Sequence, residues 1–202
     1  MATSRSSDSR SGFNRRDFLR GSGAAAVVTA LQTELDAQQQ AADSAIVSGP
    51  TKIQLNVNGQ TREVVVEPRT TLLEALRYQL DLTGAKPVCN DGSSGAATVL
   101  VDGKPLQANL LLAVACVGKT VRTVESLGGD TPDVVPLAFV EHDAEQCGFC
   151  TPGFVVAVRA FLDKNPQATD AEIRAGLNGN LCRCGTYANI IQAAIALAKG
   201  GN

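Results

Sequence analysis

The sequence has 202 residues, enough for one or two domains, and its 18 Lys and Arg are nearly balanced by 20 Asp and Glu. The basic residues are scattered and lack the stripe with interleaved aromatics that marks a nucleic-acid surface, so no nucleic-acid partner is predicted. No apolar run reaches the roughly 18 residues that a membrane-spanning helix requires.

The N-terminal segment carries a twin arginine. Residues Asn14–Arg20 read NRRDFLR, and a weakly apolar stretch, Gly21–Leu31, follows before a Gln-rich stretch. This order of parts resembles a twin-arginine export signal, which implies a periplasmic protein that is exported already folded. The alternative is a disordered basic tail. We expect residues 1–50 to be the signal and linker, and under either alternative they lie outside the fold.

A first domain is predicted over residues 51–128. Alternating polar and apolar residues predict a strand over Lys52–Val57, and the Asn58-Gly59 pair predicts a hairpin turn into a second strand, Glu63–Val66. A capping box at Thr71 then opens a helix over Leu72–Leu80.

The rest of this domain is a glycine-containing loop followed by short elements. A β-rich run, Thr98–Val101, precedes an Asp102-Gly103 turn, and an apolar segment follows at Leu110–Val117. A hairpin, one helix, a loop and further short strands indicate an α+β fold in β-grasp order.

A second, all-helical domain is predicted over residues 133–202. We expect helices over Val135–His142 and Thr151–Lys164, a third from the capping box at Thr169, and a fourth over Ala188–Lys199. A domain this small buries little surface, so a bound metal would help to stabilise it.

Four of the six cysteines form two tight pairs, C-x2-C and C-x-C, in the helical domain. We call these residues the cysteine quartet: Cys147, Cys150, Cys182 and Cys184. Four thiolates suit either a structural zinc ion or a [2Fe–2S] cluster, and disulfides are a third possibility. Generic zinc sites more often show two C-x2-C pairs, so the C-x-C pair favours iron.

The sequence segments around the quartet resemble those of a known family. The segments QCGFCTPG (146–153), GNLCRCGTYANI (179–190) and VLVDGKP (99–105) resemble the [2Fe–2S] small subunit of the xanthine oxidase family, the molybdenum hydroxylases. The resemblance runs from about Lys52 to the C-terminus. It is closest to periplasmic aldehyde or isoquinoline oxidoreductase iron–sulfur subunits.

The resemblance implies a β-grasp ferredoxin-like domain followed by a four-helix [2Fe–2S]-binding domain. It makes the cysteine quartet the ligands of the cluster in the helical domain. It also matches Gln146 and the backbone of Cys184 to positions that touch the molybdopterin of a separate large subunit.

In the ferredoxin-like domain most of the expected ligands are missing. The family's four ligand positions fall on one cysteine and three other residues: Cys89, Ser94, Ala97 and Asn109. One thiolate does not hold two irons, so we expect this loop to have lost its metal. Cys116 is expected to be a buried core residue, with a Cys89–Cys116 disulfide as the alternative.

The expected function is electron transfer within an oxidoreductase complex, with no substrate site on this chain. Electrons would pass from molybdenum in the large subunit through one [2Fe–2S] cluster to a periplasmic acceptor such as a cytochrome c. The alternative is a structural or assembly subunit with a zinc or non-conducting site.

Overall fold

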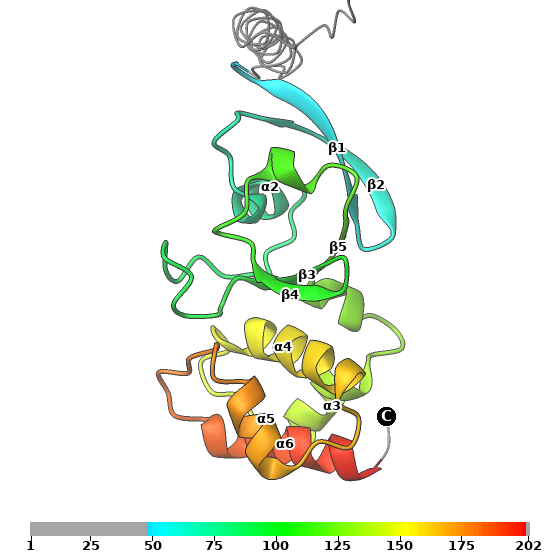
Figure 1. The fold of residues 1–202 in the computed structure, drawn as a ribbon, viewed down its shortest axis with the longest axis vertical. Coiled ribbons are helices and arrows are strands. Elements are labelled where there is room, and N and C mark those ends of the chain that lie inside the picture. The colour runs from blue at the N-terminus through cyan, green and yellow to red at the C-terminus, as the bar shows by residue number, and fades with distance from the viewer. Residues whose placement is uncertain (1–47, 201–202) are drawn as a thin grey trace, which may run out of the picture. The chain divides into compact units, whose positions relative to one another are not determined.

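The computed structural model describes residues 48–200, which contain a five-stranded mixed sheet followed by a series of helices (Figure 1). The predicted twin-arginine segment lies outside the described residues. Within residues 48–200, no helix has the length and apolar character needed to cross a membrane.

The predicted hairpin is confirmed. Strands β1 (Thr51–Val57) and β2 (Gln60–Val66) pair antiparallel along their full length. Asn58 and Gly59 connect them with φ values of 52° and 77°, the left-handed conformation that an Asn-Gly turn accepts.

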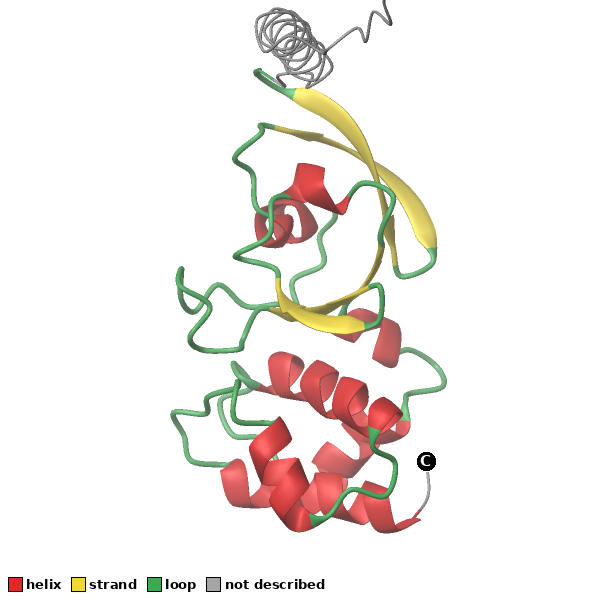
Figure 2. Ribbon diagram, in the orientation of Figure 1, coloured by secondary structure: helices red, strands yellow, loops and turns green. Residues whose placement is uncertain are grey.

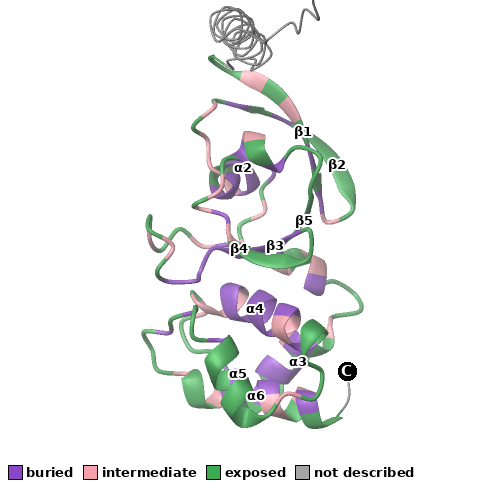
Figure 3. Cartoon of the chain, in the orientation of Figure 1, coloured by how far each residue is buried: buried purple, intermediate pink, exposed green. Residues whose placement is uncertain are grey.

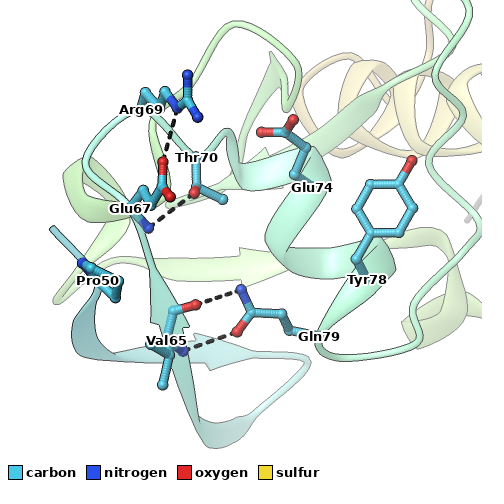
Figure 4. Close-up of a pocket in the computed structure, with 8 residues that line it drawn as sticks. All are labelled: Pro50, Val65, Glu67, Arg69, Thr70, Glu74, Tyr78 and Gln79. Atoms are coloured by element: carbon cyan, nitrogen blue, oxygen red, sulfur yellow. Dashed lines mark hydrogen bonds and ion pairs between the residues drawn. The ribbon is translucent and has the colours of Figure 1, made fainter.

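Helix α2 (Leu72–Tyr78) begins at the predicted capping box, where the Thr71 N–H donates to Glu74 Oε2 (2.7 Å) and the Glu74 N–H donates to Thr71 Oγ1 (3.2 Å). The helix ends two residues before the predicted Leu80. The side-chain amide of Gln79, just after the helix, hydrogen-bonds the Val65 N–H (2.9 Å) and carbonyl (2.7 Å) at the outer edge of β2 (Figure 4). A side-chain amide therefore satisfies backbone groups that this edge strand leaves unpaired.

Three further strands complete the sheet in the order β2-β1-β5-β3-β4 (Figure 2). Strand β3 (Thr98–Val101) was predicted, whereas β4 (Lys104–Gln107) and β5 (Thr120–Arg122) were not resolved from the sequence. Strand β5 pairs parallel with β1 and antiparallel with β3. The apolar segment after β4 forms a 3-10 helix, η1 (Ala113–Cys116).

The remaining described residues are helical. A short 3-10 helix, η2 (Val124–Leu127), leads into α3 (Val134–Glu141), α4 (Thr151–Lys164), α5 (Asp170–Gly176) and α6 (Tyr187–Gly200). The predicted helices agree with these bounds to within one residue at each predicted end, and the Thr169 capping box that starts α5 is present. The chain is thus α+β, with its sheet first and most of its helices second.

Strand β3 connects the two cores of the protein. All four of its residues are buried (Figure 3), and successive side chains point to opposite faces of the sheet. Val99 and Val101 belong to the core under α2, whereas Leu100 belongs to the core formed by the helices and packs with α4. The sheet therefore presents one face to each core. The segments that precede β3 and α4 come close together at Gly95 and Gly153.

Candidate metal centre

Two loops carry the cysteine quartet. Gln146–Cys150, the Cys147 loop, lies between α3 and α4, and Cys150 is the N-cap residue of α4. Asn180–Thr186, the Cys182 loop, joins α5 to α6. Cys182 is buried and Cys150 half-buried, while Cys147 and Cys184 are exposed. The centre therefore reaches from the helical core to the protein surface.

The thiols of the quartet meet in two pairs. Cys147 and Cys184 lie close enough for each thiol to shift the pKa of the other, and the same holds for Cys150 and Cys182. Each pair takes one cysteine from each loop, so the fold brings together all four cysteines that the sequence predicted as metal ligands. All are free thiols.

The arrangement in pairs bears on what the quartet can hold. Within residues 48–200, no three His, Cys, Asp or Glu side chains already converge on one metal-ion position. The quartet presents two thiol pairs side by side, and a [2Fe–2S] cluster takes four thiolates shared between two irons. Four cysteine thiols are a donor set that suits either a [2Fe–2S] cluster or one tetrahedral zinc ion.

Cys182 is held in a thiolate-stabilising environment. Burial acts to raise its pKa, but hydrogen bonds from Thr186 outweigh burial and lower the pKa to about 7. The Thr186 hydroxyl lies 3.1 Å from Cys182 Sγ, and the Thr186 N–H donates to the same sulfur at 3.4 Å. Because the thiolate is the form that binds metal, Thr186 favours the ligating state of Cys182.

The other three thiols respond to burial and to one another. Burial, reinforced by the neighbouring Cys182, raises the pKa of Cys150 to about 12. A hydrogen bond from the Phe149 N–H lowers the pKa of Cys147, and the hydrogen bond with Cys147 raises the pKa of Cys184. The four thiols thus differ in pKa, and metal binding would have to displace the proton from the thiol that binds it most tightly.

Tyr187 fixes the backbone at Cys182. The Cys182 N–H donates to the Tyr187 hydroxyl at 2.7 Å. The Tyr187 ring packs edge-on against the buried Phe154, with ring centroids 5.9 Å apart and an interplanar angle of 84°. The first residue of α6 therefore anchors the loop to the core.

The Cys89 loop, Cys89–Ala97, brings together three of the four positions where the family resemblance places ligands. Cys89 Sγ lies 2.9 Å from Ser94 Oγ, and Asn109 Nδ2 donates to the Cys89 carbonyl at 2.8 Å. Ala97 is buried and accepts a backbone hydrogen bond from Ala108, next to Asn109. The Cys89 loop thus offers one thiol and one hydroxyl, and Asn109 adds one amide. Cys116, by contrast, is a free thiol buried in η1, as expected.

One cavity among the described residues lies away from the cysteine quartet. It measures about 680 Å³ and lies beside α2 and β2 (Figure 4), where no cysteine lines it. Its lining residues are Pro50, Val65, Glu67, Arg69, Thr70, Glu74, Tyr78 and Gln79. The cysteine quartet is therefore the candidate functional site.

Sequence reasoning placed Gln146 and Cys184 near a pterin on a partner. Both residues are exposed on the two quartet loops, and their contact with a pterin remains a prediction. Sequence reasoning did not single out Thr186 or Asn180, which the structure shows to hold the Cys182 loop. The only signal for them was their position inside the GNLCRCGTYANI segment.

Comparison with known proteins agrees with this centre. Residues 123–195 match the family model of a [2Fe-2S] binding domain, which spans both quartet loops. Residues 12–31 match the model of a twin-arginine translocation pathway signal sequence.

Similar proteins cover the chain more fully. The chain is 40% identical to the aldehyde oxidoreductase iron-sulfur-binding subunit PaoA of Escherichia coli (strain K12), with 92% of this chain and 88% of that protein covered. It is 42% identical to the nicotinate dehydrogenase small FeS subunit of Eubacterium barkeri, covering 68% of this chain and 88% of that one.

Solved structures show the same fold. Quinoline 2-oxidoreductase from Pseudomonas putida 86 superposes with a TM-score of 0.72 at 40% identity, over 76% of this chain and 96% of that chain. Aldehyde oxidoreductase from Desulfovibrio gigas superposes with a TM-score of 0.69 at 32% identity, over 73% of this chain but 17% of that chain. The chain belongs to the iron–sulfur small subunits of the xanthine oxidase family of molybdenum hydroxylases, which serve electron transfer in oxidoreductase complexes.

Proposed function

We propose that the cysteine quartet ligates one [2Fe–2S] cluster and that this chain passes electrons through it from a molybdopterin in a separate large subunit. The observation that carries the proposal is the pairing of each cysteine of the Cys147 loop with a cysteine of the Cys182 loop. Four thiolates from two loops are what such a cluster requires.

The residues around the quartet prepare it for this task. When bound, the cluster supplies a site that accepts and releases one electron at a time. Thr186 lowers the pKa of Cys182 by donating to its sulfur, and Tyr187 holds the Cys182 backbone. Cys182 is buried and Cys150 is half-buried, so these two cysteines are less accessible to water than Cys147 and Cys184. Hydrogen bonds to sulfur and solvent exposure are the two properties through which this chain would tune the cluster's reduction potential.

The two halves of the chain have different roles in this proposal. Residues 133–202 form the four-helix [2Fe–2S]-binding domain, whereas residues 51–128 form a β-grasp domain whose Cys89 loop no longer binds metal. The chemistry of the loop supports this, because Ala97 offers no donor atom and the amide of Asn109 does not replace the thiolates that hold such clusters. Electron transfer through this chain therefore uses one cluster, not two.

The exposed apolar side chains around the quartet support contact with the large subunit. Phe149 and Leu181 flank the exposed Cys147 and Cys184, and each leaves 53% of its surface exposed. Large apolar side chains next to a redox centre are typical of a protein interface. Gln146 and the Cys184 backbone would face the pterin there. Electrons would leave to a periplasmic acceptor, for which we favour a cytochrome c, and residues 1–50 would act as the twin-arginine signal and linker.

The test is the visible spectrum of the chain coexpressed with its large subunit. A [2Fe–2S] cluster should give absorption bands that dithionite bleaches, and Cys182→Ser should abolish them. The matched control is Cys116→Ser, which changes a cysteine that lies in η1, away from the quartet, and should leave the bands intact. A colourless protein that contains zinc would show that the quartet is a structural site, and bands that survive Cys182→Ser would remove Cys182 from the ligand set.

A further inference from the structure

The backbone next to Cys182 is held by the Cys89 loop. The Leu181 N–H donates to the Ser94 carbonyl at 2.9 Å, and Asn180 Nδ2 donates to the Gly95 carbonyl at 2.9 Å. Asn180 and Gly95 are 85 residues apart in the sequence, so this contact joins the α+β half of the chain to the helical half. The two residues that precede the buried Cys182 are thus both fixed from outside their own loop.

The Asn180 amide belongs to a small buried network. Asn180 is 6% exposed, and its amide also lies 3.4 Å from the hydroxyl of Thr98, which is 3% exposed. The Thr98 hydroxyl donates to the Gly95 carbonyl at 2.6 Å and accepts from Gln107 Nε2 at 2.9 Å. Loss of one partner in such a network would leave other buried polar groups unsatisfied, which costs free energy. The network therefore opposes movement of Asn180 away from the Cys89 loop.

Packing at Gly95 shows how closely the loops approach. A β-carbon at Gly95 would lie 2.6 Å from the Gly179 carbonyl and 2.7 Å from Asn180 Cα, and one at Gly153 would overlap the Gly95 carbonyl. Gly153 lies in the first turn of α4, three residues after Cys150. The Cys89 loop therefore contacts the backbone beside both quartet loops, at positions where only glycine fits.

We propose that Asn180 is a positioning residue that sets the electronic properties of the centre by tying the Cys182 loop to the Cys89 loop. The inference rests on the proposed function, because it requires a cluster on the quartet. Cys182 receives an N–H···S hydrogen bond from Thr186. The contacts of Asn180 and Leu181 hold the end of the loop that carries Cys182, so losing the Asn180 contact would let Cys182 move relative to Thr186. Hydrogen bonds to cluster sulfurs help to set the reduction potential. The Cys89 loop thus acts as a scaffold for the centre in the other half of the chain.

The experiment compares Asn180→Ala with wild type in the full chain coexpressed with its large subunit. We expect a more negative midpoint potential in a redox titration of the visible bands, because N–H···S bonding weakens as the loop shifts. We also expect iron release to a chelator that is faster by about tenfold, the effect of losing one buried hydrogen bond.

Asn165→Ala is the matched control. Asn165 Nδ2 also donates to a backbone carbonyl, that of Phe161 at 3.1 Å, but does so at the far end of α4. This variant also loses a hydrogen bond from an Asn side chain to a backbone carbonyl, although an exposed one, and should keep the wild-type potential and rate of iron release. A potential that moved equally in both variants would show that general destabilisation of the helical half, not positioning by Asn180, changes the centre.

Thr98→Val gives a second test in case Asn180→Ala does not fold. It removes the hydroxyl that supports the Gly95 carbonyl and leaves Asn180 in place, so it should shift the potential in the same direction by a smaller amount. Wild-type potential and iron release in the folded variants would overturn the inference. A wild-type protein without a [2Fe–2S] cluster would instead overturn the proposed function, so the two failures are distinguishable.

Discussion

Cys89 Sγ and Ser94 Oγ lie 2.9 Å apart, and the Ser94 N–H donates to the same sulfur at 3.3 Å. Burial acts to raise the pKa of Cys89, but the hydrogen bonds from Ser94 outweigh it and leave the pKa below the usual thiol value. Burial raises the pKa of the other non-quartet cysteine, Cys116, which is also closed to solvent. The two cysteines outside the centre therefore differ in reactivity.

This difference predicts selective alkylation. At pH 7.5, iodoacetamide should label Cys89 of the folded, cluster-containing protein and spare Cys116, because the thiolate is the nucleophile and only Cys89 combines access with a lowered pKa. Ser94→Ala should raise the pH at which labelling of Cys89 reaches half its maximal rate, since it removes the hydroxyl that stabilises the thiolate. Peptide mass spectrometry measures both sites, and faster labelling of Cys116 than of Cys89 would contradict the prediction.

The geometry of the Cys89 loop predicts that a second centre can be rebuilt. Ser94 and Asn109 contact Cys89, and Ala97 is bonded to Ala108, the neighbour of Asn109. The family resemblance places ligands at these positions. The triple variant Ser94→Cys, Ala97→Cys, Asn109→Cys should raise the iron content from about two to about four per chain, because four thiolates complete a [2Fe–2S] site. The double variant that keeps Ala97 is the control. Unchanged iron in the folded triple variant would show that the loop has lost the shape as well as the ligands.

Metal removal should destabilise the helical half. The cysteine quartet joins two loops of a small domain, and metal binding contributes to folding free energy when the site exists only in the folded chain. Extraction of iron with a chelator under reducing conditions should lower the melting temperature by roughly 10 °C. Circular dichroism at the helical signal measures this change. An apoprotein that melts at the temperature of the iron-loaded form would show that the quartet adds nothing to folding.

Export should depend on the paired arginines. Residues 12–31 match a twin-arginine signal, and a thiolate-ligated cluster survives only in a folded site, so we expect the chain to cross the membrane folded and together with its large subunit. Changing Arg15 and Arg16 together to Lys should leave both subunits in the cytoplasm with the cluster assembled. Cell fractionation followed by iron analysis checks this. Periplasmic delivery of the double variant would disprove the role of the arginines, and export of the large subunit alone would disprove joint transport.

The elements that the sequence predicted well are those fixed by local chemistry. The capping boxes at Thr71 and Thr169 and the Asn58-Gly59 turn act within four residues, and each appears as expected. Strands β4 and β5 were missed because they are three or four residues long, and β4 carries exposed side chains without alternation. Strand β5 is defined by pairing with β1 and β3, which lie earlier in the chain, and this pairing is not encoded locally. Strand β4 pairs with β3 across the predicted Asp102-Gly103 turn.

The same limit applies to the candidate site. The C-x2-C and C-x-C spacing predicted the four cysteines because each pair is local in the chain. The contact of Asn180 with Gly95 spans the two halves of the protein, so neither residue carries a local signal for it. Long-range hydrogen bonds such as this one become visible only when the fold places both partners together.

The central claim is that one complete centre, on the cysteine quartet, carries electrons in this chain. The most direct measurement combines iron and acid-labile sulfide analysis with spin integration of the EPR spectrum of the dithionite-reduced complex. The account predicts about two irons, about two sulfides and one S = 1/2 signal per copy of this chain, because each [2Fe–2S] cluster takes four thiolates and only the quartet supplies them. About four irons with two distinct signals, or a chain without iron, would contradict it.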